Sequence, residues 1–276
     1  MSEYLVVRLA AESPVAAWIV LDAAGHRVSP AASGALTDIG AAAERRRVML
    51  LVPGLSVISR RTTLPAKNPA RLQQMLPYAL EDAVAEDVER LHFAAGLREA
   101  SGETPVSIVS RDLLEEWLAA CARAGLKPYC AYSEAEGVPE TPGRLTLVVE
   151  GDRTYGRTAD NELFAMEAMA LGEVLDVLQG EDDGELRHVV LYMDDAGHAR
   201  CEGELGALRT RTASLEVQRL PEGPLPRFGS TLIHRPGSDL LQGAYGPKSN
   251  WGALLKPWRF AAGLLLGLAL LTVLTE

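Results

Sequence analysis

Residues 76–96, LPYALEDAVAEDVERLHFAAG, hold the densest group of side chains that could do chemistry in this chain. Five carboxylates fall within nine residues, and a histidine follows them: Glu81, Asp82, Glu86, Asp87, Glu89 and His92. Such a group could form an acid/base pair, a metal site or the solvated surface of a helix. An acid/base pair needs one carboxyl group withdrawn from water and another kept in polar surroundings. The elements that position these side chains decide between the three.

A helix is predicted to carry the first of these carboxylates. Asn68 can cap its N-terminus. Apolar side chains then recur with helical period, at Leu72, Met75, Leu76, Ala79, Leu80, Ala83 and Val84. Glu81 and Asp82 lie off this stripe. Glu86 and Asp87 fall where the helix ends, so we expect all four to be solvated and not catalytic.

Helix stability does not explain these four carboxylates, because the macrodipole favours anions at the N-terminal end, by about 0.3–1 kcal/mol. Two explanations stay open: basic side chains neutralise them within the fold, or they face an external partner. The basic candidates are Arg60, Arg61, Lys67 and Arg71. His92 belongs to an alternating stretch, and we expect a packed structural histidine.

Motifs for cofactors and nucleophilic catalysis are missing from the sequence. A phosphate-binding G-x-x-x-x-G-K-[ST] loop is approached by GAYGPKSN at residues 243–250, but Pro247 intervenes and the spacing fails. The sequence has no G-x-G-x-x-G, G-x-S-x-G or H-E-x-x-H motif. Cys121, Cys130 and Cys201 lack C-x-x-C spacing, which favours reduced thiols over a disulfide or a zinc site. We therefore expect no metal and no cofactor.

The formal net charge of −10 is unevenly distributed. Residues 1–95 carry ten acidic and ten basic side chains, whereas residues 96–243 carry 26 acidic and 14 basic ones. No part of the chain has the basic footprint of a nucleic-acid-binding protein. The charge pattern therefore excludes nucleic acid as a partner.

Residues 260–275 contain no charge. Sixteen residues span about 24 Å as a helix, and the hydrocarbon core of a membrane is about 30 Å thick. A buried core helix would carry a polar stripe, which this segment lacks. Trp258 and Arg259 can extend the span to the headgroup level. We predict one transmembrane helix at 258–276, cut near its end.

The predicted membrane-spanning side chains are Phe260, Leu264, Leu265, Leu266, Leu268, Leu270, Leu271, Val273 and Leu274. The membrane-flanking ones are Lys256, Trp258 and Arg259. Basic residues on the N-terminal side of a span favour the cytoplasm. The predicted location is therefore the bacterial inner membrane, crossed once, with the N-terminal part cytoplasmic.

Apolar and alternating patterns predict the remaining elements. Strands are predicted at residues 4–10, 15–21, 47–52, 56–64, 91–97, 105–109, 127–132, 145–150, 153–158, 188–193 and 215–220. Helices are predicted at 35–46 with Ser33 as the N-cap, after Asn68, at 112–124 and at 163–178. We place a first lobe at 1–138, a second lobe at 139–243 and a linker at 244–257. This order predicts a mixed α/β (α+β) architecture and is compatible with duplicated ribonuclease-H-like lobes.

The segment at residues 76–96 resembles the hallmark segment of the type II secretion system protein L family. The approach to it, residues 50–81, has the same pattern: a strand ending in V-P, a strand ending in L-P, and then the helix. Residues 239–246, DLLQGAYG, resemble the family's L-L-Q-G-x-[YF] element, and the predicted span follows closely. The resemblance covers the whole chain in order.

This resemblance implies an inner-membrane protein with an actin-like cytoplasmic fold, one span and a small periplasmic domain, which we expect this chain to lack. The implied role is a non-catalytic platform or adaptor for protein export across the outer membrane. It would recruit the cytoplasmic secretion ATPase, protein E, through the N-terminal domain of that ATPase, and would pair with the inner-membrane protein M. Self-association is also expected.

Actin-like ATPases hold phosphate on glycine-containing loops, because glycine lets the backbone approach the ligand. The first such position here is RLAAE at residues 8–12, without glycine. The second, VEGD at 149–152, and the third, YMDDAG at 192–197, each keep one glycine. These losses argue against ATP hydrolysis. Two alternatives stay open: a divergent actin-like ATPase, which would need intact loops, and a pilus-assembly platform, in which the actin-like and membrane parts are usually separate chains.

Overall fold

The computed structural model describes residues 3–10, 15–65, 68–167, 169–179 and 187–246. The chain divides into two units, Met1–Leu241 and Gln242–Glu276. The described part of the second unit contains one 3-10 turn, η6 (Gly243–Tyr245). The first unit contains all of the sheets described below.

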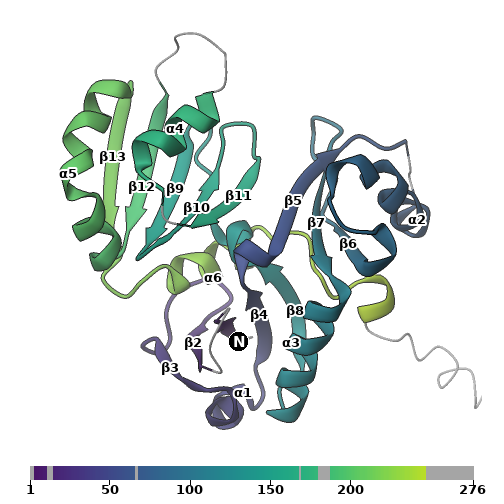
Figure 1. Ribbon diagram of the computed structural model, residues 1–276. Helices are drawn as coiled ribbons and strands as arrows, with labels where there is room; N and C mark the ends of the chain where they lie inside the picture. The colour runs from purple at the N-terminus through teal and green to yellow at the C-terminus, as the bar shows by residue number, and fades with distance from the viewer. Residues whose placement is uncertain (1–2, 11–14, 66–67, 168, 180–186, 247–276) are drawn as a thin grey trace, which may run out of the picture. The chain divides into compact units, whose positions relative to one another are not determined.

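The first sheet has the strand order β3-β2-β1-β4-β8 (Figure 1). Its strands are β1 (Tyr4–Leu9), β2 (Val15–Leu21), β3 (Ala32–Ala35), β4 (Arg47–Val52) and β8 (Pro128–Ser133). β1, β2 and β3 pair antiparallel, whereas β4 and β8 join in parallel. Five consecutive residues of β4 are buried, as expected for a central parallel strand covered on both faces.

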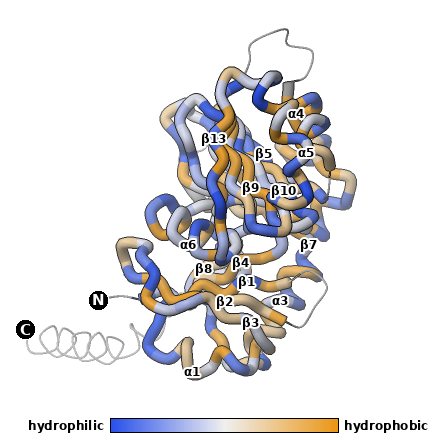
Figure 2. The backbone as a smooth tube through the Cα atoms, turned by 90° about the vertical axis from the view of Figure 1, so that its left-hand side faces the viewer, coloured by the Kyte–Doolittle hydropathy of each residue, from blue (hydrophilic) through white to orange (hydrophobic). Residues whose placement is uncertain are grey.

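The second sheet repeats this arrangement with the order β11-β10-β9-β12-β13. Its strands are β9 (Leu145–Glu150), β10 (Arg153–Arg157), β11 (Leu163–Glu167), β12 (His188–Met193) and β13 (Ser214–Arg219). Again three strands pair antiparallel and two join in parallel. The helices α4 (Leu171–Gln179) and α5 (Asp195–Arg211) pack against this sheet through a shared apolar cluster. Figure 2 shows hydrophobic residues concentrated along central strands such as β9.

Helix α6 (Leu225–His234) packs with both sheets. Its Leu225, Phe228 and Leu232 share one buried cluster with apolar residues of β1, β2, β4, β9, β10 and β12. Gly229 permits a close approach, since a Cβ there would lie 2.7 Å from Leu21 Cδ1. The core between the sheets therefore depends on a helix that follows the last strand of the second sheet.

A three-stranded antiparallel sheet is inserted between β4 and β8, in the order β5-β7-β6. Its strands are β5 (Val57–Thr62), β6 (Leu91–Ala95) and β7 (Thr104–Ser110). Helix α2 (Pro69–Ala79) covers it through Leu76, which packs with Leu91, Phe93 and Ile108. Asn68 caps this helix, as predicted, by accepting a hydrogen bond from Ala70 N. Helix α3 (Arg111–Arg123) follows β7.

Several predicted elements were wrong or missed. The predicted helix at 163–178 is strand β11 followed by the shorter α4, because residues 163–167 pair with β10. The predicted helix at 35–46 is reduced to two short turns, η1 (Leu36–Ile39) and α1 (Gly40–Ala43). Ser33 lies in β3 instead of capping a helix. Helices α5 and α6 were not predicted.

Helix α2 ends at Ala79, earlier than the apolar spacing indicated. Two 3-10 turns follow it, η3 (Glu81–Ala83) and η4 (Val88–Arg90). The predicted linker at 244–257 and span at 258–276 lie largely or wholly outside the described residues. In the part of the chain that is described, no helix combines the length and the apolar character needed to cross a membrane. The lobe boundary between residues 138 and 139 stays a prediction.

Candidate functional site: the cleft between the two hairpins

The end of β1 and the turn between β9 and β10 border a cleft of about 340 Å³. Its charged lining consists of Arg8 from the first sheet, and of Glu150, Asp152, Arg153 and Asp194 from the second. All of these residues except Arg153 belong to the three positions at which the sequence suggested degraded phosphate loops. The end of β1 and the β9–β10 turn thus bring together segments that lie far apart in the chain.

Arg8 crosses this cleft with its whole guanidinium group engaged. Its Nε donates to Glu134 Oε1 at 2.5 Å, and Nη1 and Nη2 donate to the two carboxylate oxygens of Glu150 at 2.6 Å each. Nη2 also donates to Tyr155 Oη at 3.1 Å. Burial disfavours its charge, but the hydrogen bond to Glu150 and the charges of Glu134 and Glu150 outweigh burial and raise the pKa of Arg8. Arg8 is thus a fixed cation, and all three of its side-chain nitrogens donate to groups of the protein itself.

Glu134 completes the cluster on the buried side. Its side chain is 2 % exposed, and its Oε2 accepts hydrogen bonds from Tyr155 Oη at 2.8 Å and from Gly54 N at 2.9 Å. Burial raises the pKa of Tyr155, so its hydroxyl keeps its proton as a donor. The Tyr155 ring meets Phe228 of α6 edge-on at 5.5 Å between ring centroids. Arg8, Glu134, Glu150 and Tyr155, here called the Arg8 cluster, tie the two sheets together.

Asp194 occupies the backbone amides that could otherwise bind phosphate. Its Oδ1 accepts hydrogen bonds from Gly197 N at 2.6 Å, in the first turn of α5, and from Gly151 N at 3.1 Å, in the β9–β10 turn. Helix N-termini and glycine turns are the backbone sites at which anions bind. Here the protein's own carboxylate takes that place.

The lining of the cleft is therefore net negative. It has three carboxylates against two guanidinium groups, which disfavours the approach of a triphosphate. No group of three His, Cys, Asp or Glu side chains within the described residues is arranged to hold a metal ion. The arrangement can hold two sheets in a fixed relation, because Arg8 and Asp194 bond to groups from both halves of the cleft.

A sequence model of one protein family matches residues 5–248, and its description is type II secretion system (T2SS), protein L. This chain belongs to the type II secretion system protein L family. The resemblance carried by residues 76–96 is thereby confirmed.

Individual protein L relatives agree with this assignment. Type II secretion system protein L of Pectobacterium carotovorum subsp. carotovorum is 29 % identical over 226 residues, which covers 80 % of this chain and 50 % of that protein. The protein L of Vibrio cholerae is 26 % identical over 287 residues, which covers 98 % of this chain and 65 % of that protein. The chain thus spans about half to two thirds of the length of these relatives.

Solved structures confirm the mixed α/β, actin-like fold. The cytoplasmic domain of EpsL, an inner-membrane component of the type II secretion system of Vibrio cholerae, superposes with a TM-score of 0.64 at 22 % identity, covering 88 % of this chain and 100 % of that one. The PilM–PilN type IV pilus biogenesis complex gives 0.59 at 15 % identity, covering 84 % and 98 %. A Bacteroides thetaiotaomicron protein with an actin-like ATPase fold gives 0.52 at 8 % identity, covering 84 % and 96 %.

The acidic residues singled out in this protein L chain lie outside the cleft. Glu81 and Asp82 belong to η3, and Glu86 and Asp87 lie just before η4; all four are exposed. Within the described residues none of the four forms an ion pair. Of the basic candidates for neutralising them, Arg61 pairs instead with two other carboxylates, Glu99 and Glu103.

His92 is a structural histidine, as expected. It is buried, and its Nε2 lies 2.9 Å from Leu240 O. Burial lowers the pKa of His92, which keeps the ring neutral. Leu240 belongs to the family's L-L-Q-G element and is itself fully buried, with its N–H donating to Ala131 O. Asp239 Oδ1 accepts from Ala131 N in return, so residues 239–240 are held on β8.

Sequence reasoning missed the Arg8 cluster. Two signals were available: Arg8 interrupts the otherwise apolar strand YLVVRL, and Glu150 ends the apolar strand LTLVVE at the equivalent place in the second sheet. A charge at the end of each central strand would indicate an ion pair if the two strand ends met. That meeting became visible only in the folded chain.

Proposed function

We propose that this chain is a non-catalytic adaptor of the type II secretion platform at the bacterial inner membrane. It would recruit the secretion ATPase, protein E, by binding the N-terminal domain of that ATPase, and would pair with protein M. Family membership supports the secretion role. The observation that carries the non-catalytic part is the Arg8 cluster, which fills the place where an actin-like ATPase would hold phosphate.

The energetics favour a closed cleft. Removing one partner from a buried ion pair costs about 3–5 kcal/mol, because the other charge is left without compensation. A nucleotide that displaced Arg8 would meet this cost at Glu134, and its phosphates would also face Glu150 and Asp194. An adaptor does not need Arg8 to be displaced, because it only has to present an outer surface to its partner.

Membrane attachment would hold the bound ATPase in place. The span predicted at 258–276 would anchor the chain, and the linker at 244–257 is short enough to keep a partner beside the membrane and raise its effective concentration there. Reporter fusions placed before residue 20 test the orientation, since activity confined to the periplasm would contradict a cytoplasmic N-terminus.

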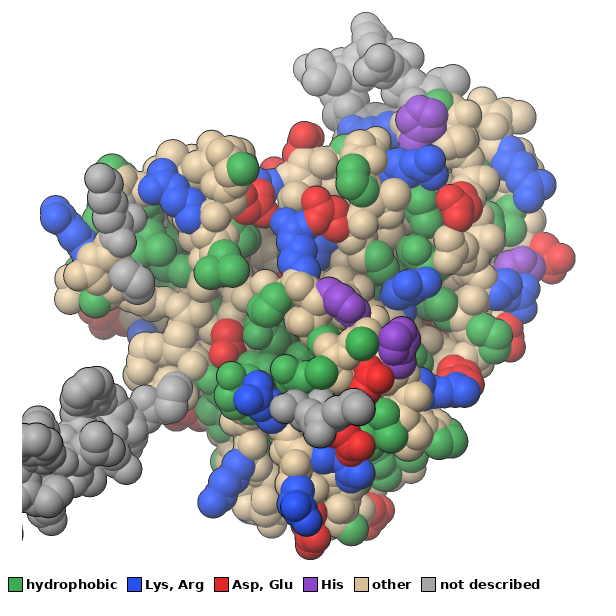
Figure 3. Space-filling view, turned by 180° about the vertical axis from the view of Figure 1, so that it is seen from behind, with side chains coloured by type: hydrophobic (Ala, Val, Ile, Leu, Met, Phe, Trp, Pro, Cys, Tyr) green, Lys and Arg blue, Asp and Glu red, His purple; other side chains and the backbone are tan. Residues whose placement is uncertain are grey.

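The surface at Glu81, Asp82, Glu86 and Asp87 is our choice for the partner-facing side. Three acidic side chains of the second sheet region are already paired: Asp176 with Arg211, Asp195 with Arg219 and Glu216 with Arg144. Figure 3 likewise shows acidic and basic side chains interspersed over the face turned away from the viewer of Figure 1. Glu81, Asp82, Glu86 and Asp87 have no ion pair among the described residues, and Lys67 lies outside those residues. We expect their field to attract a basic surface and to speed its encounter.

A pull-down with the isolated N-terminal domain of the ATPase tests this proposal. The full chain in a non-ionic detergent is the bait, at salt concentrations from about 0.05 M to about 0.5 M. We expect binding that weakens with salt and that is lost in the variant E81K/D82K/E86K/D87K. The matched control, Glu202→Lys on α5, changes an exposed carboxylate elsewhere and should bind normally. No binding of the unchanged chain at any salt, with both proteins folded, would sink the adaptor role.

A further inference from the structure

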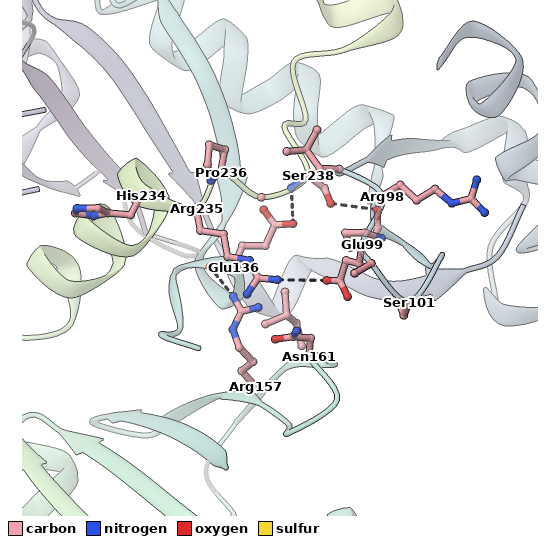
Figure 4. A pocket seen from close by; sticks show the side chains of 15 residues that line it. Arg98, Glu99, Ser101, Glu136, Arg157, Asn161, His234, Arg235, Pro236 and Ser238 are labelled. Atoms are coloured by element: carbon pink, nitrogen blue, oxygen red, sulfur yellow. Dashed lines mark hydrogen bonds and ion pairs between the residues drawn. The ribbon is translucent and has the colours of Figure 1, made fainter. Parts of the chain in front are cut away.

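A cavity of about 470 Å³ lies between strands β5 and β11 and shares no lining residue with the cleft. We call it the β5–β11 cavity. One wall is apolar and comes from β11 and α4, through Phe164, Met166, Val177 and Leu178. It adjoins a second cavity of about 520 Å³, drawn in Figure 4, and both are lined by Glu136, Asn161 and Ser238.

Polar atoms without partners are concentrated at this cavity. Six buried side-chain nitrogen or oxygen atoms of the described residues lack a hydrogen-bond partner. Four of them belong to residues that line it: Ser59 Oγ, Arg61 Nε, Glu136 Oε2 and Asn161 Oδ1. Buried polar atoms are nearly always hydrogen-bonded in folded proteins, so such a concentration indicates a site for a polar ligand.

Glu136 is the buried carboxyl group among these residues. It belongs to η5 (Glu134–Gly137) and is 4 % exposed. Its Oε1 accepts hydrogen bonds from Ser107 Oγ at 2.9 Å and from Ser238 N at 2.8 Å, while Oε2 accepts none. A buried carboxylate oxygen without a donor is costly, and a donor supplied by a ligand would remove that cost.

The charges of the cavity favour a cationic ligand. The lining holds three carboxyl and two guanidinium groups: Glu103, Glu136, Glu162, Arg60 and Arg61. Arg61 pairs with Glu103 at 2.8 Å and with Glu99 at 2.5 Å, which leaves Glu136 and Glu162 against Arg60 among the lining charges. Glu136 Oε2 and Asn161 Oδ1 are both acceptors, so together they call for a donor.

We propose that the β5–β11 cavity binds an amphipathic cation, a primary amine or guanidinium group on an apolar stem. Its head group donates to Glu136 and Asn161, and its stem packs on the wall formed by β11 and α4. Ligand sites commonly combine such an apolar wall with a few placed polar groups. The cation is either a free amine or a Lys or Arg side chain presented between apolar residues by a partner.

Binding should depend on pH through Glu136. Burial raises the pKa of Glu136 to about 7, against the smaller lowering effects of its hydrogen bonds with Ser238 and Ser107 and of the charge of Arg157. Arg157 on β10 and Tyr132 on β8 are the ionisable groups that act on it. The cation prefers the ionised carboxylate, whose fraction rises from roughly 0.1 at about pH 6 to roughly 0.9 at about pH 8, so affinity should rise roughly ninefold.

Methyl NMR of methionine tests the proposal on the full chain in a non-ionic detergent. Met166 lines the cavity, and Met49, buried in the cluster around α6, is an internal reference. The probes are 3-methylbutylamine, 3-methylbutanol and 3-methylbutanoate. We expect the amine alone to shift Met166 strongly, with roughly ninefold tighter binding at the higher pH.

Two variants assign the effect to named groups. Glu136→Gln should weaken amine binding at about pH 8 by about tenfold or more, as expected for loss of a charged hydrogen bond, and should remove the pH dependence. If that variant misfolds, Asn161→Gly deletes the second acceptor at a position whose φ of 66° suits glycine. Glu116→Gln on α3 and His234→Gln in the adjoining cavity are controls that should retain both the affinity and the pH dependence.

Three results would overturn the proposal: no shift of Met166 with the amine, equal responses to amine and alcohol, or unchanged amine binding in folded Glu136→Gln. A peptide pair, acetyl-Leu-Lys-Leu-amide and acetyl-Leu-Gln-Leu-amide, separates the two sources. Tighter binding of the lysine peptide than of the free amine identifies a partner's side chain as the ligand, and weaker binding identifies a free amine.

Discussion

Replacing Arg8 by methionine tests whether the Arg8 cluster holds the two sheets together. The change keeps the apolar stem but removes four hydrogen bonds, to Glu134, Glu150 and Tyr155. Loss of one partner from a buried ion pair costs about 3–5 kcal/mol. Glu150 is 24 % exposed and can regain water. Glu134 keeps its two other donors, so we expect the lower end, about 3 kcal/mol.

That loss corresponds to a decrease in Tm of about 6–12 °C, because a unit of this size loses about 2–4 °C per kcal/mol. Thermal unfolding of the full chain, followed by far-ultraviolet circular dichroism, measures it. Arg219→Met is the matched control, since Arg219 pairs with the exposed Asp195 and such pairs contribute at most about 1 kcal/mol. The double variant R8M/E134Q should recover part of the stability, because it also removes the uncompensated charge.

The reasoning is refuted if Arg8→Met and Arg219→Met lower Tm equally. It is also refuted if R8M/E134Q is less stable than Arg8→Met alone. Either result would mean that the cluster is solvated in solution and that the apolar core around α6 alone joins the sheets.

Two further predictions concern nucleotide and pH. Calorimetry of the full chain with ATP and Mg²⁺ should give no saturable heat at micromolar nucleotide, because Arg8, Gly151 N and Gly197 N are already bonded; a saturable signal lost in Glu150→Ala or Asp152→Ala would revive the ATPase alternative. The raised pKa of Glu136, about 7 against 4.5, means that the fold prefers the protonated carboxyl. Its contribution to stability is therefore complete below about pH 4.5 and is lost as pH rises through about 7, by about 3 kcal/mol. The free energy of unfolding, measured by urea titration at several pH values across this range, should change less with pH in Glu136→Gln than in the unchanged chain. An equal change in both proteins would show that Glu136 is not buried in solution.

The sequence by itself determined the elements whose patterns are local. The alternation of β1 and β2, the apolar run of β4 and the Asn68 cap of α2 all act within a few residues of each other, so their prediction needed no partner segment. The family could also be recognised from residues 76–96 and 239–246. Those stretches are short and contiguous, so their patterns can be read without knowing the fold.

Other elements were decided by tertiary contacts. Residues 163–167 have helical spacing, but pairing with β10 makes them a strand, since the edge of a sheet offers hydrogen bonds that an isolated helix start lacks. Helix α5 has no continuous apolar stripe, and its start depends on Asp194 accepting a hydrogen bond from Gly197 N. Helix α6 begins in a segment rich in proline and glycine and is held by the apolar cluster that it shares with both sheets.

The candidate site was decided almost entirely by the tertiary structure. Arg8 is 126 residues from Glu134 and 142 from Glu150 in the chain, so no local pattern relates them. Loss of the phosphate-loop glycines could be seen in the sequence and argued against ATP hydrolysis. The ion pairs of Arg8 with Glu134 and Glu150 could not be seen in the sequence. A charge at the end of one strand acquires its partner only when the two sheets pack together on α6.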